Sequence, residues 1–416
     1  MERVHPNRAE MKCHSCTDFS RLKLSWLQNL TGLVGFGITL WAGGHPEFSP
    51  LPETPNEGVG LWLPLLTARA GAGYRSNPEF AHDPVGTGFA STGVDYFLLR
   101  QPTDGQTVTF FFSAEDIRYF ETLRPLTNEP GATKEQTFIS DLRLGHALGG
   151  HTNWVVKFEG RHVYNDQFIN TSSFDSTTTN LSSLHATAHV GTIIPSIAWS
   201  SDGPFRVELA AVGTRQLFLN ADPETGLSST WEFGPRLTLG WSSMRAGLVE
   251  LELSGLHREF DDRVQNSALG LPLAESRLRQ DDFRTELLWR REWDEARHWQ
   301  TTLRTFYVRR RENGEGYTDF DRLGVGGNLR YQAAAWSMRL SARWSTYDYP
   351  RSYVVLGGVL AELRQRTTLQ TEARLEYRFL TGYRAYVEYT WEREGGNRIS
   401  DQYTAQVATF GLEHDF

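Results

Sequence analysis

The sequence predicts an all-β protein, a transmembrane antiparallel up-and-down β-barrel of about sixteen strands, with fourteen or eighteen strands as the alternatives. Three observations lead to this prediction. Apolar and polar residues alternate along most of the chain, the connections between the alternating segments are long and short in turn, and the last segment is an alternating strand that ends on Phe416. All three favour the same architecture.

The period of two is clear in individual segments. Trp336, Met338 and Leu340 share one side of an extended strand, whereas Ser337 and Arg339 share the other. Sixteen such segments lie at 61–75, 88–100, 106–120, 136–147, 152–164, 183–199, 204–218, 230–241, 245–260, 282–293, 298–311, 320–332, 335–347, 366–380, 383–393 and 402–416. Each is long enough for the roughly 9 to 11 residues that a tilted strand needs to cross the hydrocarbon. Charges at every second position argue against a buried parallel sheet.

The connections carry independent information. Long loops, such as 76–87 and 165–182, are expected outside the cell, and short turns, such as Thr103-Asp104-Gly105, on the periplasmic side. Both chain termini are then expected in the periplasm. A β-sandwich would not be expected to keep such an alternation, and a propeller would repeat about every 40 to 50 residues.

Two features strain this interpretation. Pro195 and Pro235 fall inside predicted strands, and since a closed barrel has no free edge, each should lie at a bulge or near a strand end. The loop 348–365 contains the apolar stretch Tyr353 to Leu360. This loop either folds inward and narrows the pore or lengthens the flanking strands.

Composition limits the alternatives. A hydrophobic content of 39% and a mean hydropathy of −0.45 are too polar for a bundle of membrane helices. They do not exclude a barrel, because only every second residue of a barrel strand meets lipid.

The first 44 residues differ from the rest of the chain. Arg21 and Lys23 precede the apolar stretch Leu30 to Trp41, and Ala42-Gly43-Gly44 supplies the small residues that a signal peptidase requires. We therefore expect a signal peptide at 1–44, a periplasmic segment at 45–60 and the barrel at 61–416.

The exported chain is acidic and lacks cysteine. Cys13 and Cys16 both lie in the expected signal peptide, and without a second pair of ligands they predict no metal site. Removing the 5 basic and 3 acidic residues of this segment from totals of 42 and 50 leaves 37 and 47, a net charge of −10. This charge argues against nucleic acid as a partner.

The polar side of the strands is dense in opposite charges, and we expect it to face the lumen. Same-side neighbours on adjacent strands lie about 4.8 Å apart, close enough to form ion-pair networks. The residues predicted to line the pore are Glu250, Glu252, Arg284, Glu286, Arg290, Arg339, Arg343, Glu372, Arg374, Glu376, Arg378 and Glu388. Such residues either set ion selectivity or only solvate and stabilise the wall.

No catalytic residue, cofactor or metal is predicted, and the chain is not expected to be an enzyme. His185 and His189 share a side of one strand, but four residues along a strand span about 13 Å, too far to bind one metal ion.

The segment Ala70-Gly71-Ala72-Gly73-Tyr74-Arg75-Ser76-Asn77-Pro78 resembles the first strand of a group of bacterial outer-membrane β-barrel porins. Some members of this group accompany exopolysaccharide export systems. The resemblance implies an outer-membrane barrel and no catalytic residues.

The expected function is a porin-like channel for passive diffusion of small hydrophilic solutes, in the outer membrane of a Gram-negative-type bacterium. The alternatives are the barrel of an exopolysaccharide export or secretion system, and a closed structural barrel. A polysaccharide track would need inward aromatic rings, for which Phe111, Tyr347 and Tyr386 are candidates. Expected partners are outer-membrane lipid and the assembly machinery, which would read the strand ending in Phe416. The sequence leaves open whether the barrel forms a homo-oligomer.

Overall fold

The computed structural model describes residues 62–80, 85–103, 106–123, 132–148, 153–170, 183–201, 203–220, 227–243, 246–268, 270–294, 296–356, 359–398 and 401–416. The chain divides into a unit Met1–Pro55 and a unit Asn56–Phe416, and the second holds every described residue. The expected signal peptide, the periplasmic segment and both cysteines lie outside the described residues.

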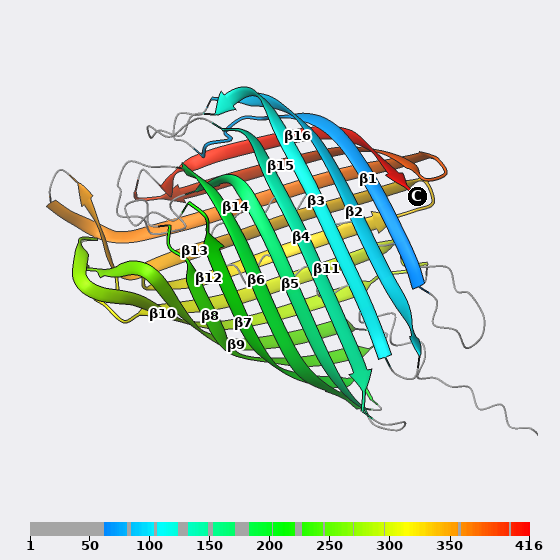
Figure 1. Cartoon of the computed structure of the whole chain (residues 1–416), viewed down its shortest axis with the longest axis horizontal. Coiled ribbons are helices and arrows are strands. Elements are labelled where there is room, and N and C mark those ends of the chain that lie inside the picture. The colour runs from blue at the N-terminus through cyan, green and yellow to red at the C-terminus, as the bar shows by residue number, and fades with distance from the viewer. Residues whose placement is uncertain are drawn as a thin grey trace, which may run out of the picture. The chain divides into compact units, whose positions relative to one another are not determined.

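The described residues form a closed barrel of sixteen antiparallel strands (Figure 1). Each strand pairs with its neighbours in sequence, and β1 closes the ring by pairing with β16. The strands are β1 Trp62–Arg75, β2 Thr87–Thr103, β3 Gln106–Leu123, β4 Ala132–Ala147, β5 Trp154–Asn170, β6 Ser183–Ser200, β7 Phe205–Phe218, β8 Thr230–Ser243, β9 Gly247–Asn266, β10 Pro272–Glu292, β11 Trp299–Glu312, β12 Phe320–Gln332, β13 Trp336–Leu356, β14 Val359–Leu380, β15 Tyr383–Gly396 and β16 Tyr403–Asp415. The predicted fold class and strand count are confirmed.

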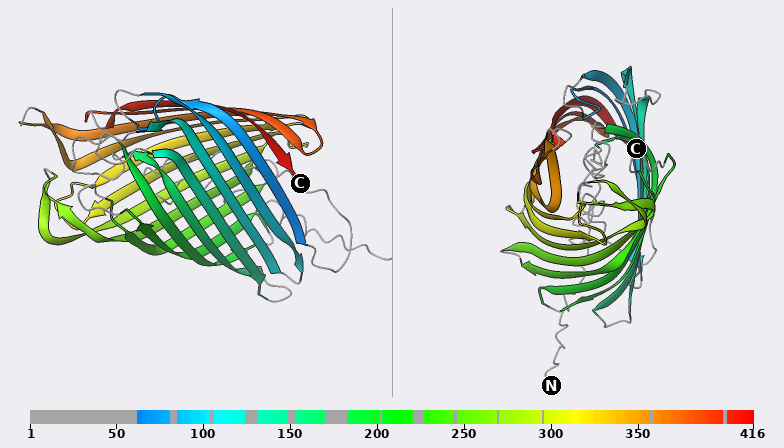
Figure 2. Two further views of the ribbon diagram at one scale, coloured as in Figure 1. Left: turned by 45° about the horizontal axis from the view of Figure 1, so that its top comes forward. Right: turned by 90° about the vertical axis from the view of Figure 1, so that its left-hand side faces the viewer.

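The views in Figure 2 show the tilted strands and the ring that they form. The described part of the chain contains no helix with the length and hydrophobicity that spanning a bilayer requires.

The closing seam follows the predicted alternation of the last strand. β1 and β16 pair from Thr67 with Asp415 to Arg75 with Val407. Phe410 and Leu412 are 64% and 56% exposed on the outer face, whereas Glu413 on the other face is buried. One strand therefore offers apolar side chains outward and a carboxylate inward.

The outer face of the barrel is apolar, and aromatic rings gather at the short-turn end of the strands. Ring centroids lie 6.5 Å apart for Trp154 and Trp199 and 4.4 Å apart for Trp336 and Tyr377. These four rings come from the turn-side ends of β5, β6, β13 and β14. Amphipathic rings at the rim of an apolar belt are typical of a membrane interface.

The prediction for the two prolines was wrong. Pro195 lies within β6 and Pro235 within β8, and neither lies at a bulge. The β6–β7 pairing passes from Ile193–Gly213 to Ser196–Ala210 without a change of register, and the β8–β9 pairing has a similar gap beside Pro235. Because proline has no N–H, each ladder loses two residue pairs beside it, and the strands then rejoin in register.

Glycine permits the close strand approach beside Pro235. A Cβ atom on Gly234 of β8 would lie 1.9 Å from the carbonyl oxygen of Gly255 in β9. No side chain fits in that space. The two strands therefore keep their register past the proline only with glycine at position 234.

The loop 348–365 lengthens the flanking strands, the second of its two predicted alternatives. β13 continues to Leu356 and β14 begins at Val359, with Tyr353 paired to Leu363 and Leu356 to Val359. β10 likewise begins at Pro272, ten residues before its predicted start at 282. The sequence missed this extension because its charges fall on both faces, and a strand that projects beyond the hydrocarbon needs no apolar face.

Candidate functional site: the charged inner wall

The inner wall of the barrel carries the charged residues that the alternation predicted. Buried Glu286, Arg374 and Glu388 define the inward side of β10, β14 and β15. Eleven of the twelve predicted residues stand in this inward alternation and are buried or half-buried: Glu250, Glu252, Arg284, Glu286, Arg290, Arg339, Arg343, Glu372, Arg374, Glu376 and Glu388. The twelfth, Arg378, has the same phase but is exposed near the turn end of β14.

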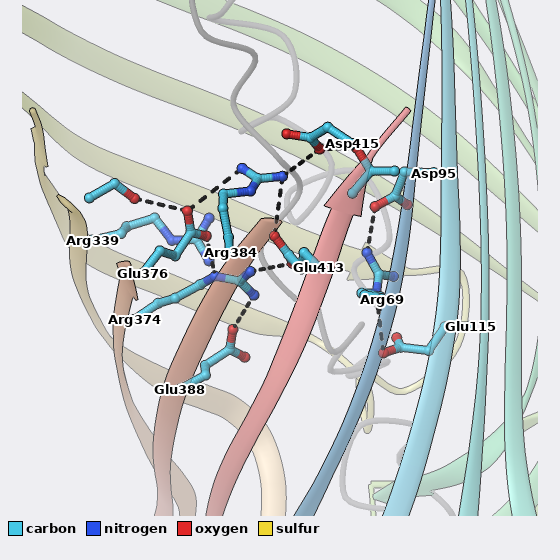
Figure 3. Close-up of polar contacts among 12 residues, drawn as sticks. Arg69, Asp95, Glu115, Arg339, Arg374, Glu376, Arg384, Glu388, Glu413 and Asp415 are labelled. Atoms are coloured by element: carbon cyan, nitrogen blue, oxygen red, sulfur yellow. Dashed lines mark hydrogen bonds and ion pairs between the residues drawn. The ribbon is translucent and has the colours of Figure 1, made fainter. Parts of the chain in front are cut away.

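Arg374 is the centre of an ion-pair network on β14, β15 and β16 (Figure 3). Its Nε lies 2.6 Å from Glu376 Oε1, its Nη1 3.0 Å from Glu388 Oε2 and its Nη2 2.5 Å from Glu413 Oε1. Side-chain exposure is 8% for Arg374, 5% for Glu388 and 6% for Glu413. One guanidinium thus satisfies three carboxylates on three strands.

Arg384 of β15 extends this network toward the closing seam. Its Nη2 lies 3.3 Å from Glu413 Oε2 and 2.8 Å from Asp415 Oδ1. Across the seam, Arg69 of β1 pairs with Asp95 of β2 at 2.5 Å (Figure 3). These ion pairs join β15 to β16 on one side of the seam and β1 to β2 on the other. Across the seam itself, the Thr67 hydroxyl of β1 donates to Asp415 Oδ1 of β16 at 2.7 Å.

Arg339 and Glu372 form a separate pair on β13 and β14. Arg339 Nη2 lies 2.5 Å from Glu372 Oε1. Since Glu372 stands two positions from Arg374 on the same side of β14, this pair lies beside the Arg374 network.

The inward acids of β9 and β10 pair only in part with the arginines of these two strands. Glu286 accepts a hydrogen bond from Arg284 of its own strand, but its second cation is Arg304 of β11, at 2.8 Å. Glu250 and Glu252 make no ion pair within 4.0 Å among the described residues. The alternation predicts which side of the barrel a residue faces. Which charges pair also depends on the register between neighbouring strands.

Sequence reasoning missed Arg69, Asp95, Arg304, Arg384 and Glu413 as members of these networks. Each stands in inward phase on its strand, so the alternation was the signal that could have found them. Glu413 required one more step, because its partner Arg374 is brought near only when β14, β15 and β16 are paired in register.

One sector of the inner wall is apolar, which the sequence analysis did not predict. Phe111, Ile139, Val163 and Val190 are buried together on β3 to β6, and Phe97 of β2 packs against them. The cluster lies beside the Arg161–Asp141 ion pair of β5 and β4, and on other strands than the Arg374 network of β14 to β16.

The three inward aromatic candidates for a sugar track are all buried. The guanidinium carbon of Arg374 lies 4.3 Å from the ring centroid of Tyr386, and that of Arg322 lies 4.6 Å from the centroid of Tyr347. Phe111 belongs to the apolar cluster. These rings serve as packing and cation–π partners of the wall.

His185 and His189 make separate contacts on the outer side of β6. His185 Nε2 lies 3.2 Å from Asp166 Oδ1, and His189 Nδ1 lies 3.1 Å from His162 Nε2. Among the described residues, no three His, Cys, Asp or Glu side chains are grouped closely enough to hold a metal ion.

The chain is similar in structure to several bacterial barrels of known structure. OccAB1 of Acinetobacter baumannii aligns with a TM-score of 0.44 and 8% identity over 85% of this chain and 96% of that one. A loop-deletion mutant of OmpT, an outer membrane protein of Vibrio cholerae, aligns with a TM-score of 0.40 and 9% identity over 86% and 99%. A structure described as a bacterial polysaccharide outer membrane secretin aligns with a TM-score of 0.40 and 10% identity over 85% and 97%.

By sequence, no protein-family model matches the chain. No curated protein matches it either.

Proposed function

We propose that this protein is an outer-membrane channel through which small hydrophilic solutes diffuse passively along a charged lumen. One observation carries the proposal: the closed ring of sixteen strands has an apolar outer face and an inner wall with Arg–Glu networks. A barrel of this strand number is wide enough to keep an aqueous lumen. Charged groups along such a lumen set its electrostatic preference.

The outer-membrane location follows from the same two faces. Exposed side chains such as Phe410, Leu412 and Leu209 would be costly in water and are stabilised in hydrocarbon. The last strand ends on Phe416, which is 70% exposed, and its backbone N–H donates to the carbonyl of Leu66 at 2.9 Å. We assign this strand the role of the signal for assembly machinery.

The lining role proposed for the inward charges has two parts. Arg374, Glu388 and Glu413 stabilise the wall, because their charges are mutually satisfied. Glu250 and Glu252, without ion-pair partners among the described residues, are the acids available to a permeating cation.

Liposome swelling tests passive diffusion. Vesicles that contain the folded protein are diluted into isotonic solutions of neutral sugars of increasing size. We expect swelling that is fast for a pentose, slower for a disaccharide and absent for a large dextran, because a lumen of fixed width excludes by size. Vesicles without protein serve as the control, and swelling no faster than theirs for every sugar would refute the channel.

A further inference from the structure

The charges of the inner wall are segregated, and one sector has arginines in excess of carboxylates. This sector is centred on the ring of Phe306 in β11, which is 3% exposed. The guanidinium carbons of Arg284, Arg322 and Arg343 lie 5.8, 4.9 and 5.0 Å from the centroid of this one ring. Three cations from three strands, β10, β12 and β13, therefore meet over one phenyl group.

Backbone geometry places this ring. Phe306 pairs with Gly324 of β12, and a Cβ atom on Gly324 would lie 2.2 Å from the Cζ atom of the ring. The ring thus lies directly on the β12 backbone. Any side chain at position 324 would displace it.

The carboxylates near this sector do not balance its cations. Glu286 is shared by Arg284 and Arg304. Neither Arg322 nor Arg343 has a carboxylate within 4.0 Å among the described residues. Arg374, on the same inner wall, differs from these two arginines because it has three carboxylate partners.

The two uncompensated arginines differ in what else they contact. Arg322 donates to the hydroxyl of Ser345 from Nε at 3.3 Å and from Nη2 at 3.2 Å, and it lies over Tyr347. Arg343 lies over Phe306, and its buried Nε has no hydrogen-bond partner in the described part of the chain. A guanidinium donor that is withdrawn from water without an acceptor costs free energy until an acceptor arrives.

The donors of this sector suit a ligand of defined chemistry. Neither guanidinium meets a carboxylate among the described residues, and the Arg322 fork donates to the neutral Ser345 hydroxyl, which an anion can replace. Each planar fork matches the paired oxygens of a carboxylate or a phosphate, and such charge-assisted bonds are stronger than neutral ones. Mutual repulsion between neighbouring cations also falls when an anion lies between them.

We propose that Arg322 and Arg343, positioned by Phe306, form a binding site in the lumen for the carboxylate or phosphate group of an anionic solute. This inference rests on the proposed channel function and assigns it a substrate class. An oxyanion in transit binds at the Phe306 sector, exchanges its water for guanidinium donors, and passes on, while the paired Arg374 network stabilises the wall.

Calorimetric titration of the folded barrel with inorganic phosphate, and separately with succinate, tests the site. We expect both anions to bind, and Arg343→Gln and Arg322→Gln each to weaken binding by about tenfold, because each removes a charge-assisted contact. Arg343→Lys keeps the charge but loses the planar fork, so its affinity should lie between those of the wild type and Arg343→Gln. Sucrose, a neutral solute, should give no comparable heat.

Arg309→Gln is the matched control. It removes the same charge from β11, but Arg309 is exposed in the outward phase of that strand, so binding should equal that of the wild type. The shift in gel mobility on heating verifies that each variant is folded. If Arg343→Gln does not fold, the binding of phosphate and succinate by Arg322→Gln and Arg343→Lys tests the site. Folded Arg322→Gln and Arg343→Gln barrels that bind both anions as tightly as the wild type would overturn the site.

The two proposals fail separately. A barrel that binds phosphate in detergent but does not let sugars enter vesicles would retain the anion site and refute passive diffusion. A barrel that admits sugars but binds neither anion would retain the channel and refute the site.

Discussion

Replacing Arg374 with alanine is expected to lower the free energy of unfolding of the barrel by about 3–5 kcal/mol, since it removes one partner from buried ion pairs. The substitution leaves Glu376, Glu388 and Glu413 without the cation that all three contact. Urea unfolding of the variant in lipid vesicles, followed by tryptophan fluorescence, measures the loss.

Arg378→Ala is the matched control for this experiment. It removes the same charge four positions along the same strand, but Arg378 is exposed, so the change should stay within about 0.5 kcal/mol. Equal effects of the two substitutions would contradict the view that the Arg374 network stabilises the wall, and would point to a general response to lost charge.

Asp401→Asn is expected to loosen the strand extension on the loop side of β14. Arg364 Nε lies 2.7 Å from Asp401 Oδ2 and Nη2 lies 2.8 Å from Oδ1, with side-chain exposures of 1% and 0%. Loss of the carboxylate charge removes this buried ion pair at a cost of about 3 kcal/mol. Hydrogen exchange at 359–366 should accelerate by about a hundredfold.

An exposed acid in the same extension gives the comparison. Asp348→Asn in β13 removes an equal charge from the surface, so exchange at 359–366 should be unchanged. If Asp401→Asn also left hydrogen exchange at 359–366 unchanged, the Arg364–Asp401 ion pair would not stabilise the strand extension.

The same ion pair predicts a pH dependence. Burial alone would raise the pKa of Asp401, but the charge and hydrogen bonds of Arg364 lower that pKa below its ordinary value. A carboxyl group with a lowered pKa in the folded state stabilises fully above its unfolded pKa of about 3.9, and the contribution is lost as the pH falls through the folded pKa. Protection of 359–366, corrected for intrinsic exchange rates, should therefore be constant from about pH 7 to pH 5 and decline only in stronger acid. Asp401→Asn should show no such decline.

The alternation of the sequence predicted the ring of strands because lipid on one side and a polar interior on the other impose a period of two. It placed β16 correctly, with Phe410 outward and Glu413 inward. It missed the start of β10 at Pro272 and the extension of β13 to Leu356, because strands beyond the hydrocarbon need no such pattern.

The contacts of the inner wall were less predictable. Arg339 and Arg343 look alike in sequence, four positions apart and on the same side of β13. Arg339 pairs with Glu372, whereas Arg343 lies over Phe306 without a carboxylate among the described residues. The difference between the two arginines depends on the register of β11, β12, β13 and β14, which determines the residues that lie next to each arginine. The sequence alone does not give that register.

Single-channel recording in a planar bilayer tests passive conduction most directly. With the folded protein inserted under a salt gradient, the account predicts steady open steps of current, and a reversal potential that moves toward cation preference in Arg343→Gln but not in Arg309→Gln. A barrel that inserts and remains folded, yet carries no current at any voltage or salt concentration, would contradict the account.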